Sequence, residues 1–265
     1  MNNKDRVQKD KVGLINKTEC GTVIERIALP RGQIHRDYIA HCLRWSYVLK
    51  QVKIGMNIID VGCGSFPLLK VLYSNKEKPT LYVGVDIRKS VIEKMMLFKT
   101  NFTVVGVVED IRVNKLGTAD DPCDEKFDIA ACLEVVEHNE AKYVDHILNE
   151  IRRVLKTGGL LLLSTPNYNG KDKAKNHVHE FTAEELQEHL WRYFTVEKMI
   201  GTFASQSDIE PVLTQAEREV YEGPKSWFNV DVLSVIFASL HPLQSRNILW
   251  ICRKEDKSDK KDSGQ

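Results

Sequence analysis

A strand–helix alternation that begins at residue 56 constrains the fold of this chain more than any other feature. Apolar runs long enough for buried strands lie at 57–61, 81–85, 102–108, 127–133 and 160–164. Helical patterns separate several of these runs, at 67–74, 89–99 and 140–155. Continuous apolar strands joined by helices predict an α/β fold with a parallel sheet covered on both faces.

The segments outside this alternation predict further elements. Residues 37–52 place apolar side chains on one helical stripe, and strands are expected at 195–200 and 247–252. The connection between these strands is longer than usual, so we expect a helical cap insertion at 202–246 near the active site. We expect a single domain over 13–254, between a disordered arm at 1–12 and a disordered tail at 255–265.

Composition limits the class of protein. No apolar stretch approaches the ~18 residues that a membrane helix needs, and the polar, charged first 13 residues are unlike a secretory signal. The six cysteines have no CxxC spacing. They therefore predict reduced thiols in a cytoplasmic protein rather than a disulfide framework or a zinc ribbon.

The net charge of +1 hides an asymmetry along the chain. Residues 1–53 carry 11 Lys and Arg against 5 Asp and Glu, whereas residues 54–265 carry 27 against 32. A basic segment can attract nucleic acid or a phosphorylated substrate. The alternative is a solvated, partly disordered arm.

A glycine loop follows the first predicted strand, in the sequence IIDVGCGSFP at 58–67. Gly62 and Gly64 allow a sharp turn and the close approach of a ligand, and amides at the next helix start can hold an anion. Asp86 ends the second predicted strand, where an acid can accept hydrogen bonds from ribose hydroxyls.

The loop distinguishes between nucleotide cofactors. Pro67 stands where the dinucleotide fingerprint requires a third glycine. Asp60 also fits poorly beside a pyrophosphate and better beside an α-amino group. These residues favour an amino-acid nucleoside over a dinucleotide, which makes an NAD oxidoreductase the least favoured reading.

The segment Asp60-Val61-Gly62-Cys63-Gly64 resembles the first motif of class I S-adenosylmethionine (SAM)-dependent methyltransferases. The resemblance continues in the family's order over residues 56–166, through Asp86, Glu109-Asp110-Ile111, Phe127-Asp128-Ile129 and the segment LKTGGL at 155–160. It implies a Rossmann-like sheet of seven mainly parallel strands, with an antiparallel last strand that forms a hairpin with its neighbour.

The same resemblance implies the cofactor contacts. Asp60, Gly62 and Gly64 would contact the methionine moiety, and Asp86 would hold the ribose. Asp110 and Ile111 would flank the adenine, although Asp110 can also be read as a turn residue. The predicted cofactor-binding set is completed by Cys63, Ile87 and Glu134.

The segment Glu134-Val135-Val136-Glu137-His138 follows the fourth predicted strand. Glu134, Glu137 and His138 have i, i+3, i+4 spacing, which shares one face if the turn is helical. These side chains can bind a divalent ion or serve as base and orienter, so they are the predicted catalytic residues. The segment resembles the E-x-x-E-H motif of ubiquinone-biosynthesis O-methyltransferases and of small-RNA 3′-end 2′-O-methyltransferases, in which it is associated with metal-dependent transfer to a hydroxyl.

A second histidine group, NHVHEFT, lies at 176–182. In the RNA-end group a histidine there completes the metal site, so His177 or His179 can join Glu134, Glu137 and His138 around Mg²⁺ or Mn²⁺. The sequence does not choose between them, and we take His179 as the fourth ligand.

Readings without a metal stay open for both histidine groups. His179 and Glu180 can simply pack before a helix that Thr182 and Glu185 cap reciprocally. His138 can be an orienting histidine, and Asn139 can be the N-cap of the next helix.

The end of the fourth strand also bears on the acceptor. DNA amine methyltransferases often carry an Asn/Asp-Pro-Pro-Tyr/Phe motif there, whereas this chain has LEVV at 133–136. We therefore expect O-methylation of a small-molecule acceptor. The alternatives are an RNA 3′-end methyltransferase and a SAM-binding module without catalysis.

Acceptor recognition is expected from the N-terminal helix and the insertion. Tyr38 and Trp45 can pack in the core or stack on a base. The other candidates are His35, Arg36, His41, Arg44, the segment 205–208, Trp227 and Phe228.

Overall fold

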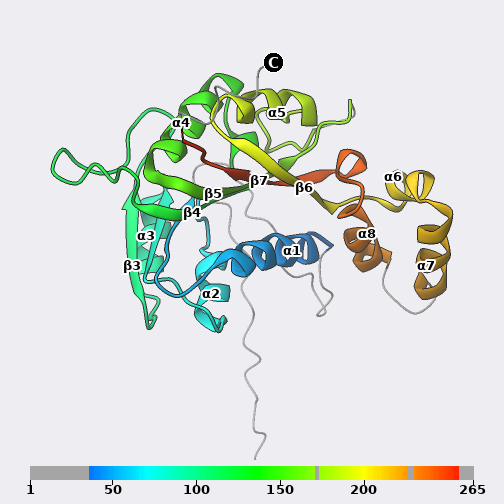
Figure 1. Cartoon of the computed structure of the whole chain (residues 1–265), viewed down its shortest axis with the longest axis horizontal. Helices are drawn as coiled ribbons and strands as arrows, with labels where there is room; N and C mark the ends of the chain where they lie inside the picture. Colours follow the sequence, from blue (N-terminus) through cyan, green and yellow to red (C-terminus); the bar gives the residue numbers. More distant parts are fainter. Residues whose placement is uncertain (1–35, 171–172, 226–229, 257–265) are drawn as a thin grey trace, which may run out of the picture.

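Seven strands join into one sheet in the computed structural model, which describes residues 36–170, 173–225 and 230–256 (Figure 1). The strand order is β3-β2-β1-β4-β5-β7-β6. The strands are β1 Asn57–Val61, β2 Leu81–Asp86, β3 Thr103–Val108, β4 Phe127–Leu133, β5 Leu155–Pro166, β6 Thr195–Phe203 and β7 Asn247–Arg253. Strands β1 to β5 pair in parallel, and β7 runs antiparallel to both β5 and β6. This confirms the predicted fold, including the antiparallel last strand.

Helices cover both faces of the sheet (Figure 1). They are α1 Arg36–Gln51, α2 Pro67–Ser74, α3 Lys89–Met96, α4 Val144–Val154, α5 Ala183–Trp191, α6 Gln206–Ile209, α7 Gln215–Lys225 and α8 Val230–Ala238. Ile58 packs with side chains of α1, α2 and α3, whereas the next residue, Ile59, packs with side chains of α4 and α5. Successive residues of a strand point to opposite faces, so a sheet covered twice needs continuous apolar runs.

Several predicted boundaries differ from the structure. Strand β5 begins at Leu155 rather than at residue 160, because Leu155 already pairs with Phe127 before the register shifts. Helix α4 begins at Val144 rather than at residue 140, because Ala141–Tyr143 forms a 3-10 turn. The helix predicted at 89–99 ends at Met96.

The predicted insertion at 202–246 contains α6, α7 and α8 with the short 3-10 helices Glu210–Val212 and Pro242–Gln244. These helices extend beyond the β6 and β7 end of the sheet (Figure 1). The predicted arm at 1–12 lies outside the described residues, as does all of the predicted tail except Glu255 and Asp256. The division into a single domain stays a prediction.

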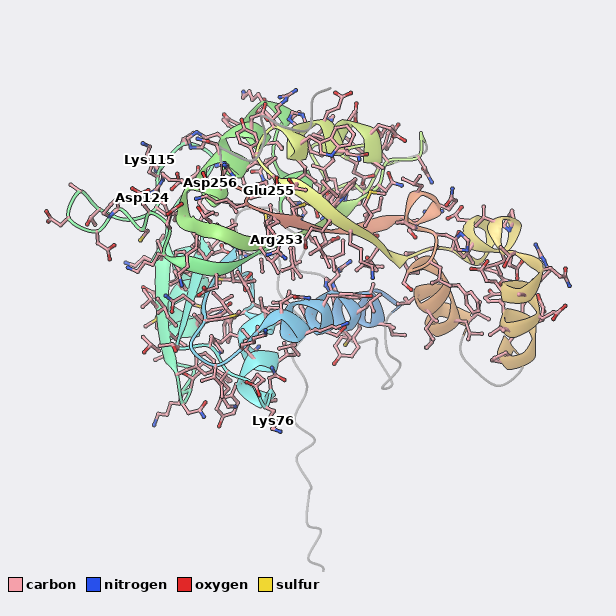
Figure 2. All side chains as sticks on the ribbon, viewed as in Figure 1. Lys76, Lys115, Asp124, Arg253, Glu255 and Asp256 are labelled. Carbon is pink, nitrogen blue, oxygen red and sulfur yellow. The ribbon has the colours of Figure 1, made fainter. Side chains whose placement is uncertain are left out.

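Two findings concern membrane helices and cysteines. No helix within 36–170, 173–225 or 230–256 has the length and apolarity to cross a bilayer. Cys42, Cys63, Cys123, Cys132 and Cys252 are free thiols, and Cys20 lies outside the described residues. Figure 2 shows Lys115 and Asp124 projecting from the connection between β3 and β4, at the periphery of the sheet.

Candidate functional site

The glycine loop turns sharply at the end of β1. Gly62 and Gly64 have φ of 70° and 53°, a left-handed conformation that glycine adopts without steric cost. The backbone amides of Gly62 and Cys63 both donate to the Val85 carbonyl, at 2.8 and 2.9 Å, which fastens the loop to the end of β2. A Cβ on Gly62 would lie 2.6 Å from the Val135 side chain. The loop therefore packs directly against the segment that follows β4.

Two carboxylates flank this loop. Asp60 is 4% exposed and accepts a 2.5 Å hydrogen bond from the Tyr82 hydroxyl. Burial raises the pKa of Asp60 to about 7, with the Tyr82 hydrogen bond acting in the opposite direction and Asp86 adding to the rise. Burial, with the nearby charges of Asp60 and Asp86, also raises the pKa of the Cys63 thiol. Asp60 and Asp86 thus act on the loop as acidic groups, and the Arg88 guanidinium partly offsets them.

Asp86 is held by the chain's own donors. Its Oδ1 accepts from the backbone N and the Nε of Arg88, both at 2.9 Å. Its Oδ2 accepts from the Gly64 amide at 3.0 Å and from the Arg88 guanidinium at 3.1 Å. A carboxylate offers about four acceptor positions, so these four donors fill them.

Asp110 repeats this arrangement at the end of β3. Arg112 donates to Oδ1 through its backbone N at 3.1 Å and its Nε at 2.8 Å, and to Oδ2 at 2.7 Å. The side-chain hydrogen bonds from Arg112 lower the pKa of Asp110. Beside these acids, Ile111 is buried and Ile87 is exposed.

Glu134 anchors the end of β4 and is not part of a helical turn. Its φ is 57°, and the 3-10 turn begins only at Val136, so Glu134 does not share a face with Glu137 and His138. One Glu134 oxygen accepts from Ser164 at 2.8 Å and lies 3.4 Å from the Arg44 guanidinium. The other oxygen accepts from the Asn247 amide at 2.9 Å.

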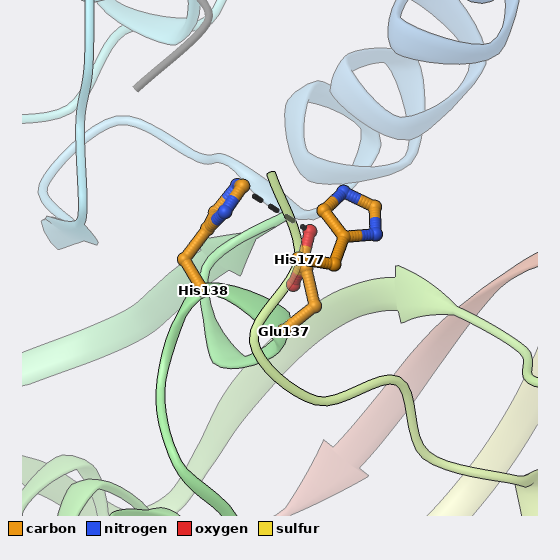
Figure 3. A group of neighbouring side chains, drawn as sticks. All are labelled: Glu137, His138 and His177. Carbon is orange, nitrogen blue, oxygen red and sulfur yellow. Dashed lines mark ion pairs between the residues drawn. The ribbon is translucent and has the colours of Figure 1, made fainter. Parts of the chain in front are cut away.

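Glu137, His138 and His177 come together instead (Figure 3). Their potential ligand atoms all lie within 4.8 Å of one another. Glu137 is fully buried and accepts from the Thr165 hydroxyl at 3.1 Å, and its other oxygen lies 4.0 Å from the His138 Nε2. The backbone amides of Val178 and His179 donate to the Glu137 carbonyl, which holds the second histidine segment against the first.

The two histidine rings in this group are oriented by acceptors on their Nδ1 side. The His138 Nδ1 lies 3.1 Å from the Asn176 carbonyl, and the His177 Nδ1 lies 2.5 Å from the Glu180 carboxylate. In a neutral ring, an acceptor beside Nδ1 favours the tautomer with the proton on Nδ1, in which Nε2 is the accepting nitrogen. His179, the predicted fourth ligand, lies outside the group, because its ring packs on Phe181 with centroids 4.4 Å apart.

Comparison with known proteins decides the family. Residues 31–222 match a family model described as a methyltransferase domain. The chain belongs to this methyltransferase family. The match confirms the resemblance to SAM-dependent methyltransferases that the motifs indicated.

Individual relatives have low sequence identity to this chain. A ubiquinone biosynthesis O-methyltransferase of Alkalilimnicola ehrlichii is 28% identical over 178 residues, which is 65% of each chain. This chain thus spans slightly less than two thirds of that curated relative.

Among solved structures, a SAM-dependent methyltransferase from Mesorhizobium loti aligns with a TM-score of 0.55 at 16% identity, over 83% of this chain and 100% of that one. The small RNA methyltransferase HEN1 aligns with a TM-score of 0.56 at 18% identity, over 88% of this chain and 27% of that one. At these identities the likeness shows the fold.

Of the two roles expected for Trp45, core packing or base stacking, the N-terminal helix shows core packing. Trp45 is 7% exposed and belongs to the core between α1 and the sheet, with the His41 ring stacked on it at 5.5 Å. His35, Trp227 and Phe228 lie outside the described residues.

Asn139 does not begin a helix, because its side chain donates back to the Val135 carbonyl at 2.7 Å. The reciprocal cap between Thr182 and Glu185 is confirmed at the start of α5.

Several polar contacts of the candidate site were not predicted. Arg88 and Arg112 are the third residues of a repeated Asp-Ile-Arg triplet, and this repeat after two successive strands was a readable signal. Tyr82 lies inside an apolar run, where its hydroxyl needs a buried partner. Arg44 was expected to help recognise the acceptor, but its contacts with Glu134 and Thr202 were not predicted, because they depend on how α1 crosses the sheet.

Proposed function

We propose that this protein transfers the methyl group of SAM to a hydroxyl oxygen of a small-molecule acceptor. The observation that carries the proposal is the glycine loop between Asp60 and Asp86, packed through Val135 against the Glu137–His138 turn. This arrangement supports a binding site for a cationic amino-acid nucleoside next to a histidine that can accept a proton.

The cofactor residues follow the order of the strands. Asp60, Gly62, Cys63 and Gly64 would surround the methionine end, Asp86 and Ile87 the ribose, and Asp110 and Ile111 the adenine. Because four donors fill the Asp86 carboxylate, ribose hydroxyls would replace the Arg88 guanidinium, which is the movable part of that donor set.

The chemistry needs alignment and one proton acceptor. Methyl transfer from a sulfonium is an in-line displacement, in which the C–O bond forms as the C–S bond breaks and sulfur leaves as a neutral thioether. The acceptor hydroxyl loses its proton to the His138 Nε2, which is unprotonated in the tautomer that Asn176 assigns. The Glu137 carboxylate, 4.0 Å away, stabilises the imidazolium that forms. In this proposal Glu134 has a positioning role, because its two oxygens already accept hydrogen bonds from Ser164 and Asn247.

The cofactor assignment is tested by Asp86→Ala. We expect affinity for S-adenosylhomocysteine, measured by calorimetry, to fall by tenfold or more, because charge-assisted hydrogen bonds to two ribose hydroxyls are lost. Asp145→Ala is the matched control, since Asp145 lies on α4 and pairs there with Arg192. Unchanged affinity in Asp86→Ala would refute the ribose assignment.

A divalent ion is a second proposal for the Glu137 group. The donors fit, because a buried carboxylate and two imidazoles converge and each imidazole is oriented by an acceptor on its other nitrogen. Glu137, His138 and His177 would hold Mg²⁺ or Mn²⁺, and the ion would lower the pKa of the acceptor hydroxyl. Glu134 and His179, which the sequence had suggested as ligands, are not in this set.

Thermal unfolding after chelation tests the metal without an acceptor. We expect added Mn²⁺ to raise the melting temperature of the wild-type protein and of His179→Ala, and to leave that of His177→Ala unchanged. A wild-type protein that Mn²⁺ does not stabilise, or an equal rise in His177→Ala, would argue against the site.

RNA is the alternative acceptor, favoured by the basic residues 1–53 and by the Glu137–His138–His177 group. Filter binding of labelled RNA across a salt series separates the two classes. Tight binding that falls steeply with salt would favour RNA, whereas weak, flat binding favours a small molecule.

A module without catalysis would bind SAM and turn over no acceptor. A cytoplasmic location is also part of the proposal, and the free thiols among the described residues are consistent with it.

A further inference from the structure

Tyr82 reaches Asp60 because of the register between β1 and β2. Tyr82 lies opposite Ile58, and Gly84 lies opposite Asp60. Residues two apart on a strand share a face, so the Tyr82 ring can extend along that face toward Asp60. A Cβ at Gly84 would lie 2.5 Å from the Met95 sulfur and 3.2 Å from the Cys63 sulfur. Because Gly84 has no side chain, the side chains of Met95 and Cys63 can approach the strand at this position.

The pair is almost completely withdrawn from water. Tyr82 is fully buried, Asp60 is 4% exposed, and the hydroxyl donates to the Asp60 Oδ2 at 2.5 Å. A buried carboxylate requires hydrogen bonds to offset its lost hydration. Among the described residues Tyr82 supplies that donor at Oδ2, so Oδ1 keeps its acceptor positions for a donor from outside the chain.

We propose that Tyr82 is a positioning residue for the α-amino group of the cofactor: its hydroxyl fixes one oxygen of Asp60 so that the other receives the ammonium. This inference rests on the proposed function, in which Asp60 contacts the methionine end. It assigns a specific part of that contact to a residue in the middle of β2, away from the glycine motif.

The charges around Asp60 support this role. The titratable groups that face it are Tyr82 and Asp86 from β2, Cys63 from the loop and Cys132 from β4. Burial and Asp86 raise the pKa of Asp60 to about 7, and the Tyr82 hydrogen bond opposes this rise. Without the hydroxyl, the carboxyl would keep its proton to a higher pH and would attract an ammonium less strongly.

Two ligands that differ in the amino-acid end of the cofactor test this contact in a binding experiment. S-adenosylhomocysteine carries the α-amino group, whereas 5′-methylthioadenosine keeps the nucleoside and thioether and lacks the amino-acid end. In Tyr82→Phe we expect calorimetric affinity for S-adenosylhomocysteine to fall about tenfold and affinity for 5′-methylthioadenosine to change less than twofold. The rise of S-adenosylhomocysteine affinity with pH should move to higher pH in the variant.

Tyr221→Phe is the matched control. Tyr221 is equally buried but lies on α7, so removal of its hydroxyl should change neither affinity. In an Asp60→Asn background, Tyr82→Phe should have little further effect on S-adenosylhomocysteine. If Tyr82→Phe does not fold, Asp60→Asn alone must show the same selective loss.

The outcomes separate this inference from the function on which it rests. Equal loss for both ligands, no loss for either, or an unshifted pH profile would overturn the role of Tyr82 while leaving a nucleoside site intact. A wild-type protein that binds neither ligand would overturn the proposed function, and this inference with it.

Discussion

At the scale of single residues, Asp60 shows how a proposed ligand contact can act against stability. Its carboxyl is buried beside Asp86, and one tyrosine hydroxyl gives only partial compensation for the lost water. Ionising this group in the folded protein is therefore costly until a cation arrives. The free energy of unfolding should reflect that cost as a function of pH.

The sign of this pH dependence follows from linkage. An unfolded Asp titrates near pH 4, whereas folded Asp60 titrates at about 7. Between these values the folded state holds a proton that the unfolded state has released, so stability falls as pH rises. Asp60→Asn has no proton to lose. We therefore expect the free energy of unfolding of the variant, relative to that of the wild type, to increase by ~1–3 kcal/mol from pH 5 to pH 8. Urea unfolding at both pH values measures it, and a constant difference would contradict the assignment.

At the scale of elements, the loop after β1 and the segment after β4 are coupled by contact. Gly62 has φ of 70°, and a Cβ there would lie 2.6 Å from a Val135 methyl group. The loop conformation and the start of the Glu137–His138 turn therefore depend on each other. Glycine is required here both for its backbone angle and for the space that it leaves.

Gly62→Ala should consequently destabilise the protein by ~1–3 kcal/mol and weaken cofactor binding, through backbone strain and overlap with Val135. Val135→Ala in the same chain should restore part of the stability, because it removes the overlap and leaves the strain. Urea unfolding of the single and double variants measures the coupling. Purely additive effects would show that the Val135 contact has no role, and Gly158→Ala, at φ of 80° with open space around it, isolates the strain alone.

The sequence predicted elements better than it predicted their ends. Runs such as Asn57–Val61 were recognisable because a sheet covered on both faces requires continuous apolar strands. The i, i+3, i+4 spacing of Glu134, Glu137 and His138 suggested one shared face. The backbone of Glu134 is left-handed, however, and the 3-10 turn begins only at Val136, so Glu134 is not part of it. Which histidine of the second group lies beside Glu137 and His138 depends on a loop held by hydrogen bonds to the Glu137 carbonyl, and spacing cannot reveal this.

At the scale of the whole molecule, a buried polar network joins the N-terminal helix to the sheet. Arg44 of α1 is 2% exposed and contacts both Thr202 of β6 and Glu134 at the end of β4. Glu134 in turn accepts from Ser164 of β5 and Asn247 of β7. Segments far apart in the chain thus converge on one carboxylate beside the proposed reaction site.

Because of this network, we expect the loss of one charge to destabilise the protein more than the loss of both. Arg44→Met leaves the nearly buried Glu134 without its cation and should lower the free energy of unfolding by ~3–5 kcal/mol. The double variant Arg44→Met with Glu134→Gln should regain part of this loss, because a neutral amide can stay hydrogen-bonded to Ser164 and Asn247. Lys89→Met, which breaks an exposed 3.7 Å pair with Glu93, should cost less than ~1 kcal/mol. Urea unfolding compares the variants, and a double variant as unstable as the sum of its two single changes would show that the pair does not join α1 to the sheet.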